Sequence, residues 1–297
     1  MSEDRWLAEA LAALPAEAQV LLGPGDDAAV LATPGGAMVV ATDALIDGVH
    51  FRLEACGGRA AARKALAVNL SDLAAMGAEP AGLLVAAVLP RPVDRALFDE
   101  LMAGFREAAA RYACPLLGGD TNAADSPLTL AVTVLGRVGP GGVVRRSGGR
   151  VGDTLSVTGP LGGSGRGRHL TFEPRLAAGA VLARDGIAHA MMDLSDGLSR
   201  DLPRLCEASG VGATLDAARI PRHADTEGVL ERALHDGEDF ELLVAHGPLD
   251  DAARAALAQA GVELTSIGML EAEAGVRLRT ADGVHALQAG GFDHLAG

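Results

Sequence analysis

Aspartates recur where the apolar stretches of this chain end or turn. The stretch DLSDGLSRDLPRL (193–205) sets Asp193 and Asp196 around Ser195 and runs directly into a helical pattern. One acceptor is enough to cap a helix N-terminus, so the second carboxylate needs another explanation. Similar stretches are GPGDDAAVL (23–31), ATDALIDGVHF (41–51), NLSDLAAMGA (69–78) and LLGGDT (116–121). Their number indicates a shared site rather than unrelated turns.

The chemistry that suits these aspartates is the binding of a hard cation. A carboxylate at the edge of an apolar element costs free energy unless it is paired or binds a cation. Mg²⁺ takes oxygen ligands, cancels the repulsion among clustered carboxylates and leaves positions open for phosphate oxygens. Lys64 is the only lysine, so a P-loop of the form G-x-x-x-x-G-K-[ST] is excluded. The aspartates therefore predict a polynuclear Mg²⁺ site that receives a polyphosphate.

Composition limits the class of protein. The chain has 297 residues, of which 49% are hydrophobic and 3% aromatic, which predicts one or two aliphatic cores. Its formal charge of -14 argues against nucleic-acid and anionic-membrane partners. Cys56, Cys114 and Cys206 lie far apart, as is typical of reduced thiols. The acidic N-terminus does not resemble a signal peptide, and no apolar run approaches the roughly 20 residues that span a bilayer. We expect a cytoplasmic protein.

The elements that must position the aspartates alternate between strands and helices. In the first half we expect a strand over 37–41, a helix over 59–76, a buried strand over 81–90, a helix over 94–113 and a strand over 128–138. Leu66, Leu70 and Leu73 share one face of the first helix, from which Asn69 and Asp72 project together. The Gly- and Arg-rich stretch 139–153 has no apolar period. We therefore predict two domains, 1–140 and 141–297.

The second half follows the same alternation. We expect strands over 154–159, 187–194 and 238–246. Helices are predicted over 173–186, 197–210, 226–237 and 249–261, and a terminal hairpin turns at 281–283. Both halves thus mix strands with crossover helices, which is an α/β or α+β architecture.

Read in order, the motifs resemble those of the thiamine-monophosphate kinase family, within the aminoimidazole-ribonucleotide-synthetase-like superfamily. To the stretches above they add RRSGGRVGDTLSVTG, MMDLSDGLSRDL, GEDFELL and GGFDH, so the resemblance covers nearly the whole chain. It implies a two-domain α/β (α+β) fold in which the N-terminal sheets of two subunits pair, giving a homodimer, and a C-terminal α/β domain. It also implies that ATP gives its γ-phosphoryl group directly to thiamine monophosphate, with several Mg²⁺ ions bound.

The resemblance further implies roles for particular residues. Gly118 and Gly119 would bring backbone close to the ATP phosphates, since neither has a Cβ. Arg146 and Ser195 would contact ATP phosphate, and no side-chain nucleophile is implied. The residues implied to ligate Mg²⁺ are Asp27, Thr42, Asp43, Asp72, Asp120, Asp193 and Asp196. The residues implied to face the thiamine ligand are His50, Glu238 and Phe292.

One segment departs from the family pattern. After TGPLGG the chain continues SGRGRHLTFEPR, where the family usually has a longer stretch. Arg166 and Arg168 stand where small or apolar residues are usual. This departure concerns the lid and the nucleotide side of the site more than the metal cluster.

Two alternative functions stay open at this point. The chain could be another ATP-using member of the superfamily, although it lacks the terminal cysteines expected of a selenophosphate synthetase or of the hydrogenase-maturation relative. A ribonucleotide cyclo-ligase fits the DGVHF and GEDFELL contexts less well. Alternatively, the chain could bind nucleotide or thiamine phosphate without turnover.

Overall fold

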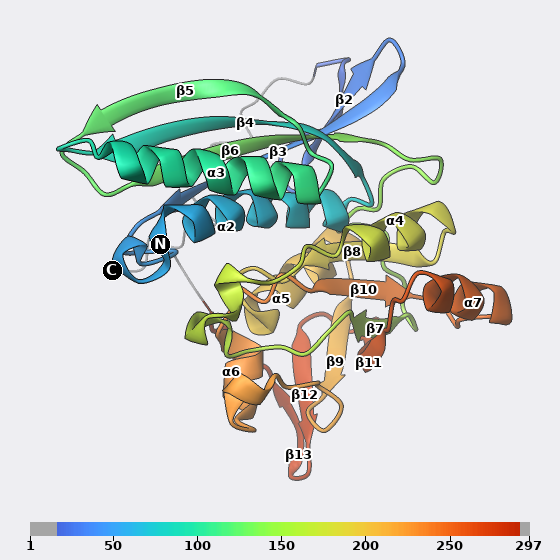
Figure 1. The fold of residues 1–297 in the computed structure, drawn as a ribbon. Coiled ribbons are helices and arrows are strands. Elements are labelled where there is room, and N and C mark those ends of the chain that lie inside the picture. Colours follow the sequence, from blue (N-terminus) through green and yellow to red (C-terminus); the bar gives the residue numbers. More distant parts are fainter. Residues whose placement is uncertain (1–16, 292–297) are drawn as a thin grey trace.

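The first half of the chain forms a six-stranded sheet in the order β1-β2-β3-β6-β4-β5. The computed structural model describes residues 17–291 and is shown in Figure 1. All neighbouring strands of this sheet run antiparallel except β4 and β5, which are parallel. Its elements are β1 (Val20–Leu22), β2 (Ala29–Thr33), β3 (Gly36–Ile46), α2 (Leu53–Ala75), β4 (Glu79–Pro90), α3 (Arg95–Arg111), β5 (Leu116–Ala124) and β6 (Thr129–Arg137).

Helices α2 and α3 cover one face of this sheet (Figure 1). Along β6, buried residues alternate with partly exposed ones, as expected when one face packs on a core. The predicted stripe of Leu66, Leu70 and Leu73 is fully buried, which confirms the helix, although α2 starts earlier and kinks at Gly57. Strand β4 was predicted to be buried, but only one of its faces is covered, and Leu84 is 41% exposed.

The second half forms a seven-stranded sheet in the order β13-β12-β9-β11-β7-β10-β8. Its strands are β7 (Thr154–Val157), β8 (Ala188–Asp193), β9 (Gly212–Asp216), β10 (Leu242–His246), β11 (Thr265–Glu271), β12 (Val276–Thr280) and β13 (Gly283–Ala286). Its helices are α4 (Leu176–Arg184), α5 (Leu198–Ser209), α6 (Leu230–His235) and α7 (Asp251–Gln259), with the 3-10 turns η1 (Ser164–Arg166), η2 (Arg168–Leu170) and η3 (Ala224–Thr226). The mixed α/β fold with two sheets and the terminal hairpin are both as predicted.

Two predictions for this half were inexact, and two strands were missed. The expected strand over 238–246 begins only at Leu242, because Glu238 and Phe240 have φ values of 53° and 50°, which no strand adopts. The helix expected over 226–237 is limited to the six residues of α6. Strands β9 and β11 were not predicted.

The two halves meet along α2, which lies between the first sheet and the second half (Figure 1). It packs on α4 and β8 as well as on α3. A Cβ on Gly179 of α4 would lie 2.0 Å from the carbonyl oxygen of Ala74, so the two helices touch through backbone. No helix or strand occurs between Val138 and Asp153, as predicted, while the boundary at residue 140 stays a prediction.

Two further predictions concern cysteines and membranes. Cys56, Cys114 and Cys206 are free thiols, as expected. Within residues 17–291, no helix is both long enough and apolar enough to cross a bilayer.

Candidate functional site

Three of the predicted aspartates meet where the two halves join. Asp27 follows β1, Asp72 projects from α2 and Asp193 ends β8, yet one carboxylate oxygen of each lies within 4.8 Å of the others. The hydroxyl of Ser71 on α2 donates to Asp193 Oδ2 at 2.6 Å, across the boundary between the halves. The cluster therefore exists only when both halves are folded together.

Asp43 extends this cluster from β3. Its backbone N–H donates to Asn69 Oδ1 at 2.9 Å. Burial raises the pKa of Asp72, and the charge and hydrogen bonding of the Asp43 carboxyl group raise it further. Asn69 and Asp72 thus project from the same part of α2, as predicted. This geometry ties the strand to the helix at the point where the carboxylates gather.

The cluster is electrostatically unfavourable in the absence of a cation. Burial, followed by repulsion from neighbouring aspartates, raises the pKa of Asp72 and Asp193 well above the ordinary value. Burial also raises the pKa of Asp26 to about 6. Arg146 supplies partial compensation, because its Nη2 donates to Asp27 Oδ1 at 2.6 Å and its backbone N–H donates to Asp26.

The donor set fits a hard divalent cation. The side chain of Asp27 is fully buried, and its Oδ2 atom has no hydrogen-bond partner among the described residues. A buried carboxylate oxygen without a partner is costly, and it is the type of ligand that Mg²⁺ prefers. Mg²⁺ would therefore satisfy this oxygen and neutralise the surrounding charge.

A cavity of about 240 Å³ opens beside the cluster. Lys64, Val68 and Asp72 are spaced four residues apart on α2, so they follow one side of the helix over about 12 Å. Lys64 Nζ binds Glu238 at one end of this row, and Asp72 joins the aspartates at the other. The lining residues are Asp43, Ala44, Leu45, Val49, His50, Val68, Asp72, Asp193, Ser195, Asp196, Asp236, Glu238 and Phe240.

Seven of the fourteen predicted site residues line this cavity. Ser195, His50 and Glu238 line it. Asp196 lines it too, but its carboxylate accepts a hydrogen bond from Arg204 at 2.7 Å. Arg146 lies beside the cluster through its contact with Asp27. Phe292 lies outside the described residues.

Four predicted residues are not brought to the cluster. Thr42 on β3 pairs with Thr133 on β6, and Thr133 pairs with Leu84 on β4. Leu84 in turn pairs with Gly118 on β5. This row of four residues lies on the uncovered face of the first sheet. Asp43 faces the helices because alternate residues of a strand point to opposite faces. By the same alternation Asp120, which pairs with Ala86, faces away from α2.

Gly118 and Gly119 lie at a second cavity, of about 260 Å³, between β5 and α3. A Cβ on Gly119 would lie 1.9 Å from the carbonyl oxygen of Val85, so close packing between strands requires this glycine. The nearest atom to a Cβ on Gly118 would be Leu84 Cδ2, at 3.9 Å. Packing therefore explains Gly119, whereas Gly118 has room for a Cβ but a φ of 156°, which residues other than glycine rarely adopt.

Sequence reasoning missed several residues of the site. Phe240 lines the cavity, and its ring stacks on Phe172 with the centroids 4.3 Å apart. Asp201 is buried and accepts the N–H of Asp196, and burial raises its pKa to about 7. The GEDFE motif already contained Phe240, so its signal was present in the sequence.

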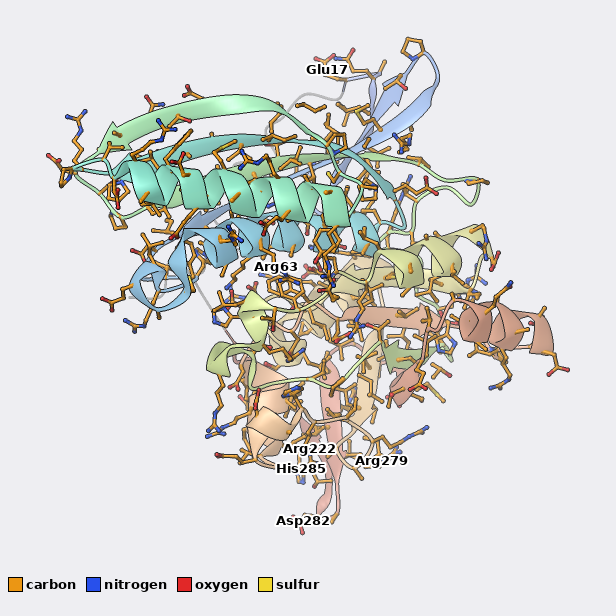
Figure 2. All side chains as sticks on the ribbon, in the orientation of Figure 1. Glu17, Arg63, Arg222, Arg279, Asp282 and His285 are labelled. Carbon is orange, nitrogen blue, oxygen red and sulfur yellow. The ribbon has the colours of Figure 1, made fainter. Side chains whose placement is uncertain are left out.

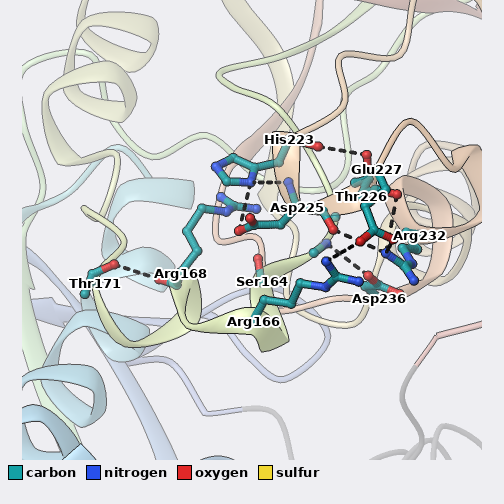
Figure 3. Close-up of polar contacts among 12 residues, drawn as sticks. Ser164, Arg166, Arg168, Thr171, His223, Asp225, Thr226, Glu227, Arg232 and Asp236 are labelled. Atoms are coloured by element: carbon teal, nitrogen blue, oxygen red, sulfur yellow. Dashed lines mark hydrogen bonds and ion pairs between the residues drawn. The ribbon is translucent and has the colours of Figure 1, made fainter.

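Ion pairs fix the segment 164–175, which departs from the family pattern. Arg168 donates to the buried carboxylate of Asp239, and Arg166 donates to Glu227 at 2.8 Å. Figure 3 shows Arg166 and Arg232 converging on Glu227. Arg166 and Arg168 therefore hold the turns η1 and η2 against the segments that carry Glu227 and Asp239.

Known proteins resemble the chain over almost its full length. Residues 25–138 match the family of the AIR synthase related protein, N-terminal domain, and residues 131–280 match that of the C-terminal domain. The thiamine-monophosphate kinase of Rhodopirellula baltica is 40% identical, over 89% of this chain and 87% of that protein. The enzyme of the same name from Escherichia coli K12 is 38% identical, over 93% of each chain.

The fold of the chain agrees with a solved structure described as AaThiL complexed with AMPPCP and TMP. The TM-score is 0.85 and the identity 27%, covering 99% of this chain and 97% of that one. Together with the sequence relatives, this agreement favours the thiamine-monophosphate kinase family over another ATP-using family of the superfamily. The chain belongs to the thiamine-monophosphate kinase family, within the AIR synthase related proteins.

Proposed function

We propose that this protein transfers the γ-phosphoryl group of ATP directly to thiamine monophosphate at a site where its aspartates hold several Mg²⁺ ions. The observation that carries the proposal is the carboxylate cluster at one end of a cavity whose other end holds Glu238. With Mg²⁺ bound, the aspartate end would attract a phosphate. At the other end, the Glu238 carboxylate and the Phe240 ring suit a cationic heterocycle. Thiamine monophosphate carries both groups.

The residues proposed to hold Mg²⁺ are Asp27, Asp43, Asp72 and Asp193. The bound ions would neutralise the charge of the phosphates as they approach each other. Arg146 lies within reach of the same phosphates, since its guanidinium already contacts Asp27. Ser195 presents a hydroxyl from the cavity wall.

The reaction needs no covalent intermediate with the protein. A terminal oxygen of the thiamine monophosphate phosphate attacks the γ-phosphorus in line with the bond to the β–γ bridging oxygen. That bond breaks, and ADP leaves with the electron pair. The task of the protein is to position the two ligands and stabilise the charge, and the side chains described above suffice for both.

We also propose that the uncovered face of the first sheet pairs with the same face of a second copy. This face carries the row Ala44, Ala131 and Ala86 in register on β3, β6 and β4, and the exposed Leu84 and Leu117 lie on β4 and the edge strand β5. Small residues allow two sheets to approach closely, and exposed leucines gain by burial. Thr42 and Asp120 would then lie at the subunit interface. We expect light scattering to give the mass of a dimer and Leu84→Arg to give that of a monomer; a wild-type monomer would refute the pairing.

One assay tests the proposed activity. Purified protein with ATP, Mg²⁺ and thiamine monophosphate should form thiamine diphosphate and ADP in equal amounts, and EDTA should abolish both products. A protein that binds both ligands tightly but forms no product would be a non-catalytic binding relative, and the proposal would fail.

A further inference from the structure

The only lysine of the chain is fully buried at the junction of the two halves. Lys64 lies on α2 with its side chain at 0% exposure. An ammonium group is among the groups that are most costly to bury, and burial accordingly lowers the pKa of Lys64. A chain that otherwise uses arginine for its basic residues therefore keeps this lysine in an unfavourable place.

All the donors of Lys64 are occupied. An ammonium group has three N–H donors. Lys64 Nζ donates to Glu238 Oε1 at 2.5 Å, lies 2.7 Å from His169 Nδ1 and donates to the carbonyl oxygen of His50. These acceptors come from three segments: the GEDFE loop, the turn η2 and the loop after β3. Lys64 thus has no donor left for a phosphate, and its effect on the cavity must be indirect.

Two of its three partners line the cavity. Glu238 and His50 both belong to the wall. Glu238 has a left-handed backbone conformation, with φ at 53°, and its N–H donates to the carbonyl oxygen of Ser195 at 2.6 Å. This conformation is unfavourable for a residue with a Cβ, so contacts from elsewhere must hold it. Among the described residues, Glu238 pairs with Lys64 and with His169, and of these two only the Lys64 side chain is fully buried.

The third partner fixes the position of the ammonium group. Burial and the charge of Lys64 lower the pKa of His169 to about 4, so the ring is neutral at neutral pH and Nδ1 can accept a hydrogen bond from the ammonium group. His169 is held there by its neighbours: Arg63 on α2 donates to the carbonyl oxygens of Leu170 and Thr171 at 2.9 and 3.1 Å. Figure 2 labels Arg63 between α2 and this segment.

We propose that Lys64 is a positioning residue that fixes the Glu238 carboxylate and the His50 backbone at the wall where the cationic heterocycle of the phosphate acceptor binds. This inference rests on the proposed function. Lys64 contacts Glu238 at one end of the cavity, whereas the aspartate cluster lies about 12 Å further along α2. Lys64 therefore governs affinity for thiamine monophosphate and not for ATP.

The test compares Lys64→Met with Arg95→Met. Arg95 begins α3 and forms an exposed ion pair with Asp99, and neither residue lines the cavity. We expect Lys64→Met to raise the KM for thiamine monophosphate at least tenfold while the KM for ATP stays within twofold of wild type. Arg95→Met should change neither. An unchanged KM for thiamine monophosphate, or an equal rise in both KM values, would overturn the inference.

A second variant covers the case in which Lys64→Met does not fold. The partly buried Glu238 carboxylate, left without its partner, is the expected cause of misfolding, so Lys64→Met combined with Glu238→Gln should restore folding. This double variant should still bind thiamine monophosphate at least tenfold more weakly than wild type. Wild-type affinity in the folded double variant would refute the role of the pair.

Calorimetry with thiamine monophosphate alone separates this inference from the proposed function. If wild type binds the ligand but forms no thiamine diphosphate, the proposed activity fails. The inference then stands if the Kd of the folded variant rises at least tenfold, and it fails if the Kd is unchanged. If wild type does not bind the ligand at all, both fail.

Discussion

Asp72→Asn is expected to lower kcat by roughly a hundred- to a thousandfold, the range found when one group that stabilises transition-state charge is removed. Asp72 is the member of the cluster that α2 contributes, and its oxygen lies within 4.8 Å of those of Asp27 and Asp193. An amide is a weaker ligand for Mg²⁺ than a carboxylate, and the site loses one negative charge. Because the amide has nearly the same shape, packing around α2 should be unchanged.

The same substitution should stabilise the metal-free protein. Burial and the charges of Asp43, Asp193 and Asp27 raise the pKa of Asp72 well above 3.8, so the folded state binds more protons than the unfolded state above that pH. The free energy of unfolding therefore falls as pH rises from the unfolded pKa through the folded one. Asp72→Asn removes this penalty, and each kcal/mol gained should raise Tm by about 2 to 4 °C.

The measurements are kcat with saturating Mg²⁺ and Tm in EDTA at several pH values. Asp282→Asn, at the tip of the β12–β13 hairpin (Figure 2), is the control and should leave both at wild-type values. In EDTA the wild-type Tm should decline with rising pH more steeply than that of Asp72→Asn. A variant that melts early in EDTA, or keeps full activity, would show that Asp72 is a structural residue.

The sequence predicted the aspartate cluster because its members stand at element ends that converge. Asp193 ends a strand, Asp72 lies on the helix face next to Asn69, and Asp43 is in the strand that Asn69 contacts. Such positions follow from local periodicity, and the ordered motifs then indicated that they share one site. The convergence of Asp27 with them could not be derived locally, because a loop carries it.

The sequence did not predict which residues face away. Thr42 and Asp43 were assigned together, but neighbours in a strand point to opposite faces, and the strand was predicted to end at residue 41. Asp120 raises the same difficulty, since β5 is an edge strand whose orientation depends on its register with β4. Register is a property of the assembled sheet, so a motif alone does not specify it.

Buried ion pairs between distant segments were also beyond sequence reasoning. Glu238 was assigned to the substrate from its motif, but its partner Lys64 is 174 residues away. The positive φ values of Glu238 and Phe240 interrupt an apolar run that otherwise has the pattern of a strand. Local propensity predicts a strand there, and only the tertiary contacts of Asp239 and Glu241 with Arg168 and Arg175 account for the loop.

Gly119→Ala should destabilise the protein more than Gly118→Ala. Both positions have a positive φ, 159° and 156°, which costs a residue with a Cβ about 1 to 3 kcal/mol, and at Gly119 a steric clash adds about 1 to 3 kcal/mol. A Cβ on Gly119 would lie 1.9 Å from the carbonyl oxygen of Val85, so β5 must move away from β4 to accept it. That oxygen belongs to the backbone and cannot rotate aside as a side chain would. At Gly118 the nearest atom would be a leucine methyl group at 3.9 Å, an ordinary contact.

This pair of substitutions also separates packing from nucleotide binding. If the backbone at Gly118 approaches the ATP phosphates, Gly118→Ala should raise the KM for ATP while its Tm falls less than that of Gly119→Ala. The difference in Tm should be about 2 °C or more, since the added clash at Gly119 costs about 1 kcal/mol or more and each kcal/mol corresponds to about 2 to 4 °C. Urea unfolding, Tm and the KM for ATP should be measured on both variants. If Gly119→Ala is as stable as wild type, the strand contact does not require glycine; if Gly118→Ala leaves the KM for ATP unchanged, neither glycine can be assigned to the nucleotide.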